Sequence, residues 1–149
     1  MTDAPAGTPA IPPGRGLGCW EFGDMGGGPS DKEASIALIR FAWEKGITHF
    51  DTAEDYGSGR SEQVLGEAVA PFSGTAFVSS KAHAADKQKT VLIVEGILRR
   101  LNRPWLDLFY IHWPKTGLDL RPMMEALEAL RREGRIRMIG VSNFGLPEL

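Results

Sequence analysis

The stretch HFDTAEDYGSGRSE, residues 49–62, decides how the rest of the chain is interpreted. It begins in an apolar strand pattern around Phe50, reaches a carboxylate at Asp51, and presents Tyr56 just before a glycine-rich turn. Such a pattern is either an ordinary strand end followed by a turn, or the working end of an active site. The two interpretations differ in what the neighbouring strands should carry at their own ends.

Five segments have the length and apolar content of buried strands, and amphipathic helical patterns separate them. The expected strands cover residues 15–20, 47–53, 75–81, 106–113 and 136–144. The expected helices cover residues 31–46, 61–69, about 91–101 and 123–134. This alternation predicts a parallel sheet with right-handed crossovers. It is compatible with an open doubly wound sheet or with part of an eight-stranded (β/α) barrel.

Polar side chains gather at one end of these strands, although a buried parallel strand should be apolar throughout. The second strand ends in Asp51, the third in Lys81, the fourth in His112, and the fifth in Ser142 and Asn143. The carboxyl ends of parallel strands share one edge of the sheet, which carries the ligand site in both architectures. The sequence therefore predicts a functional site at that edge.

Several common site motifs do not match. The glycines of GRGLGCW lie within or before the first strand, whereas a dinucleotide-binding turn follows it. The loop GDMGGGPS lacks the Gly-Lys-Ser/Thr ending of a phosphate-binding loop, and YGSGR does not follow a strand directly, as a nucleophile elbow requires. No pair of Cys or His residues has zinc-ligand spacing, so no metal site is predicted.

The polar groups suit proton transfer to a carbonyl oxygen. A tyrosine phenol is a weak acid near neutral pH, and a nearby lysine ammonium stabilises its phenolate. A buried lysine needs a carboxylate to keep its charge, and Asp51 could serve Lys81 in this way. Neutral His112 could hydrogen-bond a substrate carbonyl while Tyr56 donates the proton and a reduced nicotinamide donates hydride.

The motifs GLGCW, HFDTAEDYGSGRSEQVLG, FVSSK, LDLFYIHWP and GRIRMIGVSNF, in this order and spacing, resemble an aldo-keto reductase across about residues 15–146. The resemblance implies a (β/α)8 barrel of the TIM type that binds NADPH, with NADH as an alternative, and reduces small carbonyl compounds to alcohols. It implies that Tyr56 is the general acid, tuned by Lys81 and Asp51, and that His112 orients the carbonyl group.

The same resemblance implies a nicotinamide site and a substrate pocket. Ser142 and Asn143 would hold the nicotinamide carboxamide. Gly18, Cys19, Trp20 and Asp51 would line the nicotinamide end of the cleft. The substrate pocket would be walled by Trp20 and Trp113.

The length of the chain sets an alternative to this reductase function. A complete barrel of this type takes ~250 residues, whereas this chain has 149 and ends after the fifth expected strand. We expect residues 1–14 to form a flexible tail and residues 15–149 to form an incomplete barrel. Its open face would expose interior residues such as Leu108 and Tyr110 to water. The alternative function is therefore an inactive, truncated half-barrel that acts as a partner-binding or regulatory remnant, with self-association possible through its open edges.

Composition limits the other classes of partner. The formal net charge is −2 and 42% of the residues are apolar, which argues against nucleic acid or an anionic membrane as the main partner. No segment reaches the ~18 apolar residues of a membrane span. The single cysteine, Cys19, makes a reducing compartment the default, so a cytoplasmic location is expected.

Overall fold

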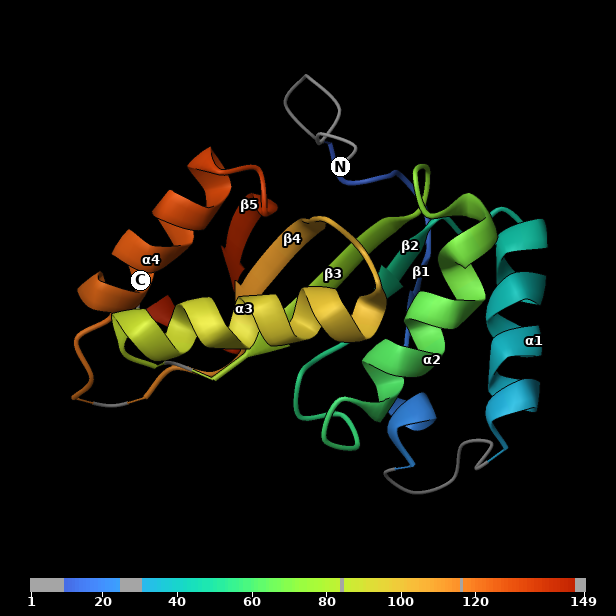
Figure 1. Ribbon diagram of the computed structural model, residues 1–149, viewed down its shortest axis with the longest axis horizontal. Helices are drawn as coiled ribbons and strands as arrows, with labels where there is room; N and C mark the ends of the chain where they lie inside the picture. Colours follow the sequence, from blue (N-terminus) through green and yellow to red (C-terminus); the bar gives the residue numbers. More distant parts are fainter. Residues whose placement is uncertain (1–9, 25–30, 84, 116, 147–149) are drawn as a thin grey trace.

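The computed structural model describes residues 10–24, 31–83, 85–115 and 117–146. Strands and helices alternate through these residues (Figure 1). The strands are β1 (Gly16–Gly18), β2 (His49–Asp51), β3 (Phe77–Ala82), β4 (Leu106–Ile111) and β5 (Ile136–Val141). The α-helices are α1 (Lys32–Glu44), α2 (Arg60–Val69), α3 (Lys87–Leu101) and α4 (Arg121–Arg132), and the 3-10 helices are η1 (Trp20–Gly23) and η2 (Ala70–Phe72).

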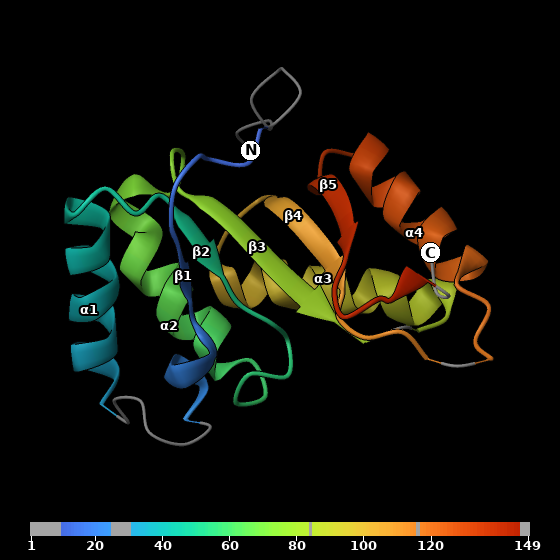
Figure 2. The same cartoon turned by 180° about the vertical axis from the view of Figure 1, so that it is seen from behind.

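The strand order separates the two predicted architectures. All five strands pair in parallel in the order β1-β2-β3-β4-β5, so each crossover leads to the adjacent strand. A doubly wound sheet would reverse its order at a switch point and carry helices on both faces. Here the four α-helices lie on one side of the sheet, and the view from behind shows the strands with no helix in front of them (Figure 2). The described residues therefore form five strands and four α-helices of a TIM-type (β/α) barrel, as predicted.

The helices attach to the sheet through apolar faces with helical spacing. The buried face of α4 is formed by Met123, Ala126, Leu127 and Leu130. Helix α3 buries Val94, Leu98 and Leu101, as their spacing predicts, together with Ile97, while Val91 is only partly buried. On the sheet, Phe50, Val78 and Phe109 join the same core. Each large side chain that is fully buried in this way stabilises the fold by about 1.5–3 kcal/mol.

The opposite face of the sheet is less exposed than the sequence suggests. Leu108 is only 4% exposed, so the expectation that it would meet water is wrong. Tyr110, its neighbour on the same face, is half-buried. Both side chains lie close to Gly140 of β5, where a β-carbon would come within 2.8 Å of the Tyr110 ring and 3.5 Å of Leu108 Cδ1. Glycine at this position lets the Tyr110 ring lie against the sheet, whereas the Leu108 distance is an ordinary van der Waals contact.

The amino-terminal edge of the sheet is closed by a buried carboxylate. Asp107 Oδ2 accepts a hydrogen bond of 2.9 Å from the Val78 backbone N–H and one of 3.2 Å from Arg103 Nη2. Asp107 Oδ1 accepts a third, of 3.0 Å, from Arg137 Nη1. Burial lowers the pKa of Arg103, and Asp107 opposes that shift. These contacts tie β3, β4 and β5 together at the end where each strand begins.

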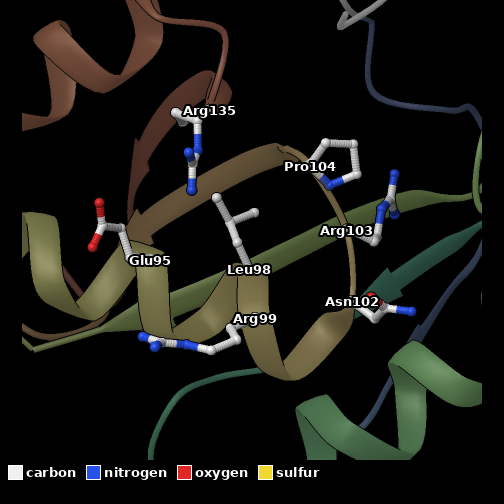
Figure 3. Close-up of a pocket in the computed structure, with 7 residues that line it drawn as sticks. All are labelled: Glu95, Leu98, Arg99, Asn102, Arg103, Pro104 and Arg135. Carbon is white, nitrogen blue, oxygen red and sulfur yellow. The ribbon is translucent and has the colours of Figure 1, made fainter. Parts of the chain in front are cut away.

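A hollow of about 510 Å³ lies near this amino-terminal edge, beside the carboxyl end of α3 (Figure 3). In Figure 3 the side chains of Leu98 and Arg135 point toward one another across it. It is lined by Glu95, Leu98, Arg99, Asn102, Arg103, Pro104 and Arg135. No residue of the predicted site borders it. Among the described residues, no helix is long and apolar enough to cross a membrane.

Candidate active site

The side chains predicted to form the site lie together at the carboxyl-terminal edge of the sheet. Asp51 is the last residue of β2, Lys81 lies near the end of β3, and His112 directly follows β4. Tyr56 lies in the loop between β2 and α2. The convergence follows from parallel pairing, because neighbouring strands of one sheet bring their carboxyl ends to the same rim.

Lys81 is the buried centre of this group. Its side chain is 8% exposed, and its Nζ donates to Asp51 Oδ2 at 2.5 Å and to the Thr52 carbonyl oxygen at 2.8 Å. Asp51 in turn accepts a hydrogen bond of 2.7 Å from Ser79 Oγ through its other oxygen. The carboxylate keeps the buried ammonium charged, and the hydrogen bonds hold its nitrogen at a fixed position.

The loop that carries Tyr56 is held by a close backbone approach. Gly57 has φ 60°, and a β-carbon there would lie 2.0 Å from the Gly23 carbonyl oxygen. A larger residue at position 57 would therefore push the loop away from η1. The start of α2 adds a second anchor, because the Ser61 hydroxyl donates to the Cys19 carbonyl oxygen at 2.6 Å and lies 2.8 Å from Thr52 Oγ1.

Tyr56 lies between the cation and the imidazole. Lys81 Nζ is 5.2 Å from the centroid of the Tyr56 ring. The Tyr56 and His112 rings meet edge to face, with centroids 5.9 Å apart and an interplanar angle of 76°. Burial lowers the pKa of His112, and the charges of Lys81 and His83 act in the same direction, against Asp55 and Asp51. The lowered pKa favours the neutral form of the His112 ring at neutral pH. A neutral imidazole can donate a hydrogen bond to a carbonyl oxygen and keep its proton.

The predicted cofactor residues lie at the two ends of this rim. The Cys19 backbone N–H donates to the Asp51 carbonyl oxygen at 2.8 Å, and Gly18 pairs with Asp51 across the β1–β2 ladder. Cys19 is fully buried, and burial raises the pKa of its thiol above the ordinary range, with the Asp51 charge acting in the same direction. A thiol in that environment is a packing group rather than a nucleophile.

Asn143 lies across the rim from Cys19, beyond the end of β5. It adopts the left-handed conformation, with φ 61°. Its Nδ2 donates to the His112 carbonyl oxygen at 2.8 Å and to Ser142 Oγ at 3.0 Å. The Ser142 N–H donates to the Ile111 carbonyl oxygen, which continues the β4–β5 ladder. These bonds connect the end of β5 to His112, whose imidazole is a candidate catalytic group.

Two exposed tryptophans follow the ends of β1 and β4. The Trp20 side chain, at the start of η1, is 43% exposed, and Trp113 is 49% exposed. The Trp113 ring lies 6.0 Å from that of His112. Large aromatic surfaces left open beside a polar rim are typical of ligand sites.

Sequence reasoning missed three side chains at this edge. Ser79 connects Asp51 to His49, whose Nε2 lies 3.0 Å from Ser79 Oγ. Ser79 lies two positions before Lys81 in β3, so strand periodicity alone places both side chains on the same face of the sheet. Asp55 and His83 are both exposed, and Asp55 also lies between the rings of His83 and His112. Nothing in local sequence spacing indicates that contact.

A buried carboxylate supports Lys81 from behind. Glu62 is fully buried, and its oxygens accept hydrogen bonds of 2.8 Å from Ser80 Oγ and 2.6 Å from Arg100 Nε. Burial raises the pKa of Glu62, and Arg100 opposes the shift. Since Ser80 precedes Lys81 and faces the helices, this network fixes β3 where the lysine leaves the strand.

A sequential parallel sheet with its polar groups on the carboxyl rim defines the (β/α)-barrel class, and comparison with known proteins gives the family. The family model described as "Aldo/keto reductase family" matches residues 16–149. The chain therefore belongs to the aldo-keto reductase family, as its motifs predicted.

Curated relatives agree with this assignment. The chain is 34% identical over 146 residues to aldo-keto reductase YhdN of Bacillus subtilis, covering 90% of this chain and 44% of that protein. It is 36% identical over 139 residues to methylglyoxal reductase YeaE of Escherichia coli, covering 92% of this chain and 48% of that protein. The chain thus spans less than half the length of these two relatives.

Solved structures agree on the fold. A crystal structure of an aldo-keto reductase from Klebsiella pneumoniae in complex with NADPH matches with a TM-score of 0.82 at 33% identity, covering 89% of this chain and 46% of that one. The thermostable aldo-keto reductase Tm1743 in complex with the inhibitor epalrestat matches with a TM-score of 0.83 at 35% identity, covering 90% and 50%. The described sheet and helices therefore correspond to about half of a family barrel.

Proposed function

We propose that this chain carries the catalytic groups of an NADPH-dependent reductase that converts aldehydes or ketones to alcohols. One observation carries the proposal: a buried ammonium, Lys81, is held by Asp51 at 2.5 Å and lies 5.2 Å from the ring of Tyr56. The relatives support the same class of reaction, since they include a methylglyoxal reductase and a rat aflatoxin B1 aldehyde reductase member 2 that is 35% identical.

In this proposal Tyr56 is the general acid. When NADPH is bound, it supplies the hydride that the carbonyl carbon receives. The carbonyl oxygen takes the phenol proton, so an alcohol and a Tyr56 phenolate are formed and solvent later returns the proton. Lys81 stabilises the phenolate by its positive charge, and Asp51 keeps Lys81 charged and in position. Neutral His112 hydrogen-bonds the carbonyl oxygen and orients it toward the phenol.

The rim fits a nicotinamide. A β-carbon added at Gly18 would meet no heavy atom within 4 Å, so the rim is open beside Asp51, where a flat ring could lie. Asn143 uses its amide N–H groups within the protein, which leaves its side-chain carbonyl oxygen to accept from the nicotinamide carboxamide, with the Ser142 hydroxyl beside it. Gly18, Cys19, Trp20 and Asp51 would border the ring. NADH carries the same nicotinamide and could use the same groups.

Trp20 and Trp113 would wall the substrate pocket. Their exposed indoles flank the polar rim and offer flat apolar surface to a small carbonyl compound. In this arrangement the substrate carbonyl points toward Tyr56 and His112, while its apolar part contacts the tryptophans.

The test uses the two tyrosines of the chain. Oxidation of NADPH by an aldehyde is followed by absorbance for the wild type, Tyr56→Phe and Tyr110→Phe. We expect Tyr56→Phe to lower kcat by roughly 100- to 10,000-fold, because the general acid is lost. Tyr110→Phe, a half-buried tyrosine on the same face of the sheet, should retain activity. Equal turnover by the wild type and Tyr56→Phe would contradict the proposal, as would a wild type that neither binds NADPH nor reduces an aldehyde.

A second candidate function is a non-catalytic half-barrel that associates with itself or a partner. Within the described residues, β1 and β5 each pair on one side only, and Val141 at the end of β5 is 40% exposed. Unpaired strand edges are templates for further pairing. Sedimentation across a concentration series, together with an NADPH titration, separates the two functions. A concentration-dependent dimer without cofactor binding or turnover would favour the half-barrel, and a monomer that binds NADPH would exclude it.

A further inference from the structure

A cluster of three side chains lies at the outer rim, and only one of them, His112, has a role in the proposed proton transfer. Asp55, His83 and His112 come from the loops or positions that follow β2, β3 and β4. Their nearest ligand-type atoms, one from each residue, all lie within 4.8 Å of one another. The Asp55 carboxylate lies between the two imidazoles, with Oδ1 3.4 Å from His112 Nδ1 and Oδ2 3.3 Å from His83 Nε2.

The second observation concerns His112. His112 is 6% exposed. Its Nδ1 is buried and has no hydrogen-bond partner, because the contact to Asp55 lacks hydrogen-bond geometry. A buried polar nitrogen without a partner is costly, so its persistence calls for an explanation. This nitrogen faces the Asp55 carboxylate, and that carboxylate faces the second imidazole.

The spacing of these atoms matches a tetrahedral metal ion. With metal–ligand bonds of about 2.0–2.1 Å, two ligands of a tetrahedral zinc ion are roughly 3.3 Å apart. The two carboxylate oxygens of Asp55 each have this separation from one imidazole nitrogen, Oδ1 at 3.4 Å from His112 Nδ1 and Oδ2 at 3.3 Å from His83 Nε2. One ligand atom from each of the three residues lies within 4.8 Å of the others, so binding requires the His83 side chain, which is 59% exposed and follows the end of β3, to move closer.

We propose that Asp55, His83 and His112 form a binding site for a divalent transition-metal ion of the zinc type. Two imidazoles and one carboxylate are a ligand set that zinc accepts with a fourth position open to water. The same set disfavours magnesium and calcium, which prefer oxygen ligands. The adjacent Lys81 does not compete for Asp55, because its Nζ donates to Asp51 and to the Thr52 carbonyl oxygen.

The ion would coordinate His112 through Nδ1 and hold the imidazole in one orientation at the rim. Because the site lies beside Tyr56, the availability of the metal would affect the activity of the enzyme. Binding of the ion does not require that the chain reduce carbonyl compounds, so a failure of the reductase proposal and a failure of the metal site are observed separately.

The experiment measures binding directly. Tag-free, metal-free chain is titrated with Zn2+ by competition against a chromophoric chelator, and Co2+ is used as a spectroscopic probe of the coordination geometry. We expect one ion per chain, with a tetrahedral cobalt absorption band. His83→Ala and Asp55→Asn should each weaken zinc binding by at least ~10-fold, because each removes a ligand. Magnesium at the same concentrations should not compete with zinc for the site, so the amount of zinc bound by the chelator should stay the same.

The third histidine of the chain gives the matched control. His49→Gln removes an imidazole that lies 3.0 Å from Ser79 and outside the cluster, so zinc affinity should remain that of the wild type. Far-ultraviolet circular dichroism of each metal-free variant shows whether it is folded. Wild-type affinity in both His83→Ala and Asp55→Asn would overturn the proposal, as would equal loss in His49→Gln or no zinc binding by the folded wild type.

Discussion

The two ends of the sheet each bury a carboxylate against positive charge, and they do so differently. At the amino-terminal end, the Asp107 side chain is 5% exposed and accepts hydrogen bonds from two arginines and one backbone N–H. At the carboxyl-terminal end, the Asp51 side chain is 34% exposed and is shared between Lys81 and Ser79. The first carboxylate is enclosed, whereas the second faces an open rim.

The groups around each carboxylate differ in the same way. The Asp107 network connects β3, β4 and β5 to one another and presents no acid or base to solvent. The Asp51 network leads outward, through Lys81 to the half-buried Tyr56 and to the neutral imidazole of His112. In a barrel of this type, polar residues at the amino end serve stability and those at the carboxyl end serve chemistry. We therefore expect substitutions at the two ends to affect different measurements.

After Tyr56→Phe, the largest effect on turnover is expected for Lys81→Met at the carboxyl end. In the proposed mechanism the substitution removes the charge that stabilises the Tyr56 phenolate, so it should lower kcat by roughly 100- to 1,000-fold. Steady-state NADPH oxidation measures the effect. Lys87→Met is the matched control, because the Lys87 side chain is 62% exposed and pairs with exposed Glu125. Comparable losses of kcat in both variants would remove the distinction between the two regions.

A smaller effect is expected behind the rim. Glu62→Gln keeps the size of the side chain but removes the charge that pairs with Arg100, so the free energy of unfolding should fall by about 2–3 kcal/mol. Chemical denaturation measures this change. Glu67→Gln should change it by only about 0–1 kcal/mol, because Glu67 pairs with Lys32 on the surface with a side chain 54% exposed. A loss in Glu67→Gln as large as in Glu62→Gln would show that burial does not set the effect.

Much of this arrangement could be predicted from the sequence, because the strand and helix periodicities determine it. Alternating strand and helix patterns require a parallel sheet, and parallel pairing brings Asp51, Lys81 and His112 to one rim whatever the details of the loops. The choice between a barrel and a doubly wound sheet depended on the resemblance, and the sequential strand order then settled it.

Contacts between loops could not be predicted in this way. Asp55 and His83 are 28 positions apart, and only the conformation of two separate loops brings them together. The burial of Leu108 was missed as well: its face of the sheet could be predicted, but not the close packing of its neighbour Tyr110 against Gly140 on the next strand. Periodicity gives the face on which a residue lies, but not the size of its neighbour across the sheet.

The smallest expected effect is a dependence of stability on pH. The pKa of His49 lies below its ordinary value, chiefly because the ring is half-buried, and burial shifts the pKa of His112 in the same direction. The unfolded chain then binds protons more readily than the folded chain as the pH falls below ~6.5, so the free energy of unfolding should decrease from about pH 7 to about pH 5. His49→Gln should make this decrease shallower in denaturation series at each pH. A slope identical to that of the wild type would exclude His49 as a contributor.

The comparison of the two ends is tested most directly by Asp51→Asn and Asp107→Asn, with turnover per folded molecule and the free energy of unfolding measured for both. For Asp107→Asn we expect a loss of about 3–5 kcal/mol in the free energy of unfolding, because buried Arg103 and partly buried Arg137 lose their counter-charge, with turnover per folded molecule unchanged. For Asp51→Asn we expect the larger loss of turnover and the smaller loss of stability. The reverse pattern, or equal losses in both measurements, would contradict the assignment of chemistry to the carboxyl-terminal rim.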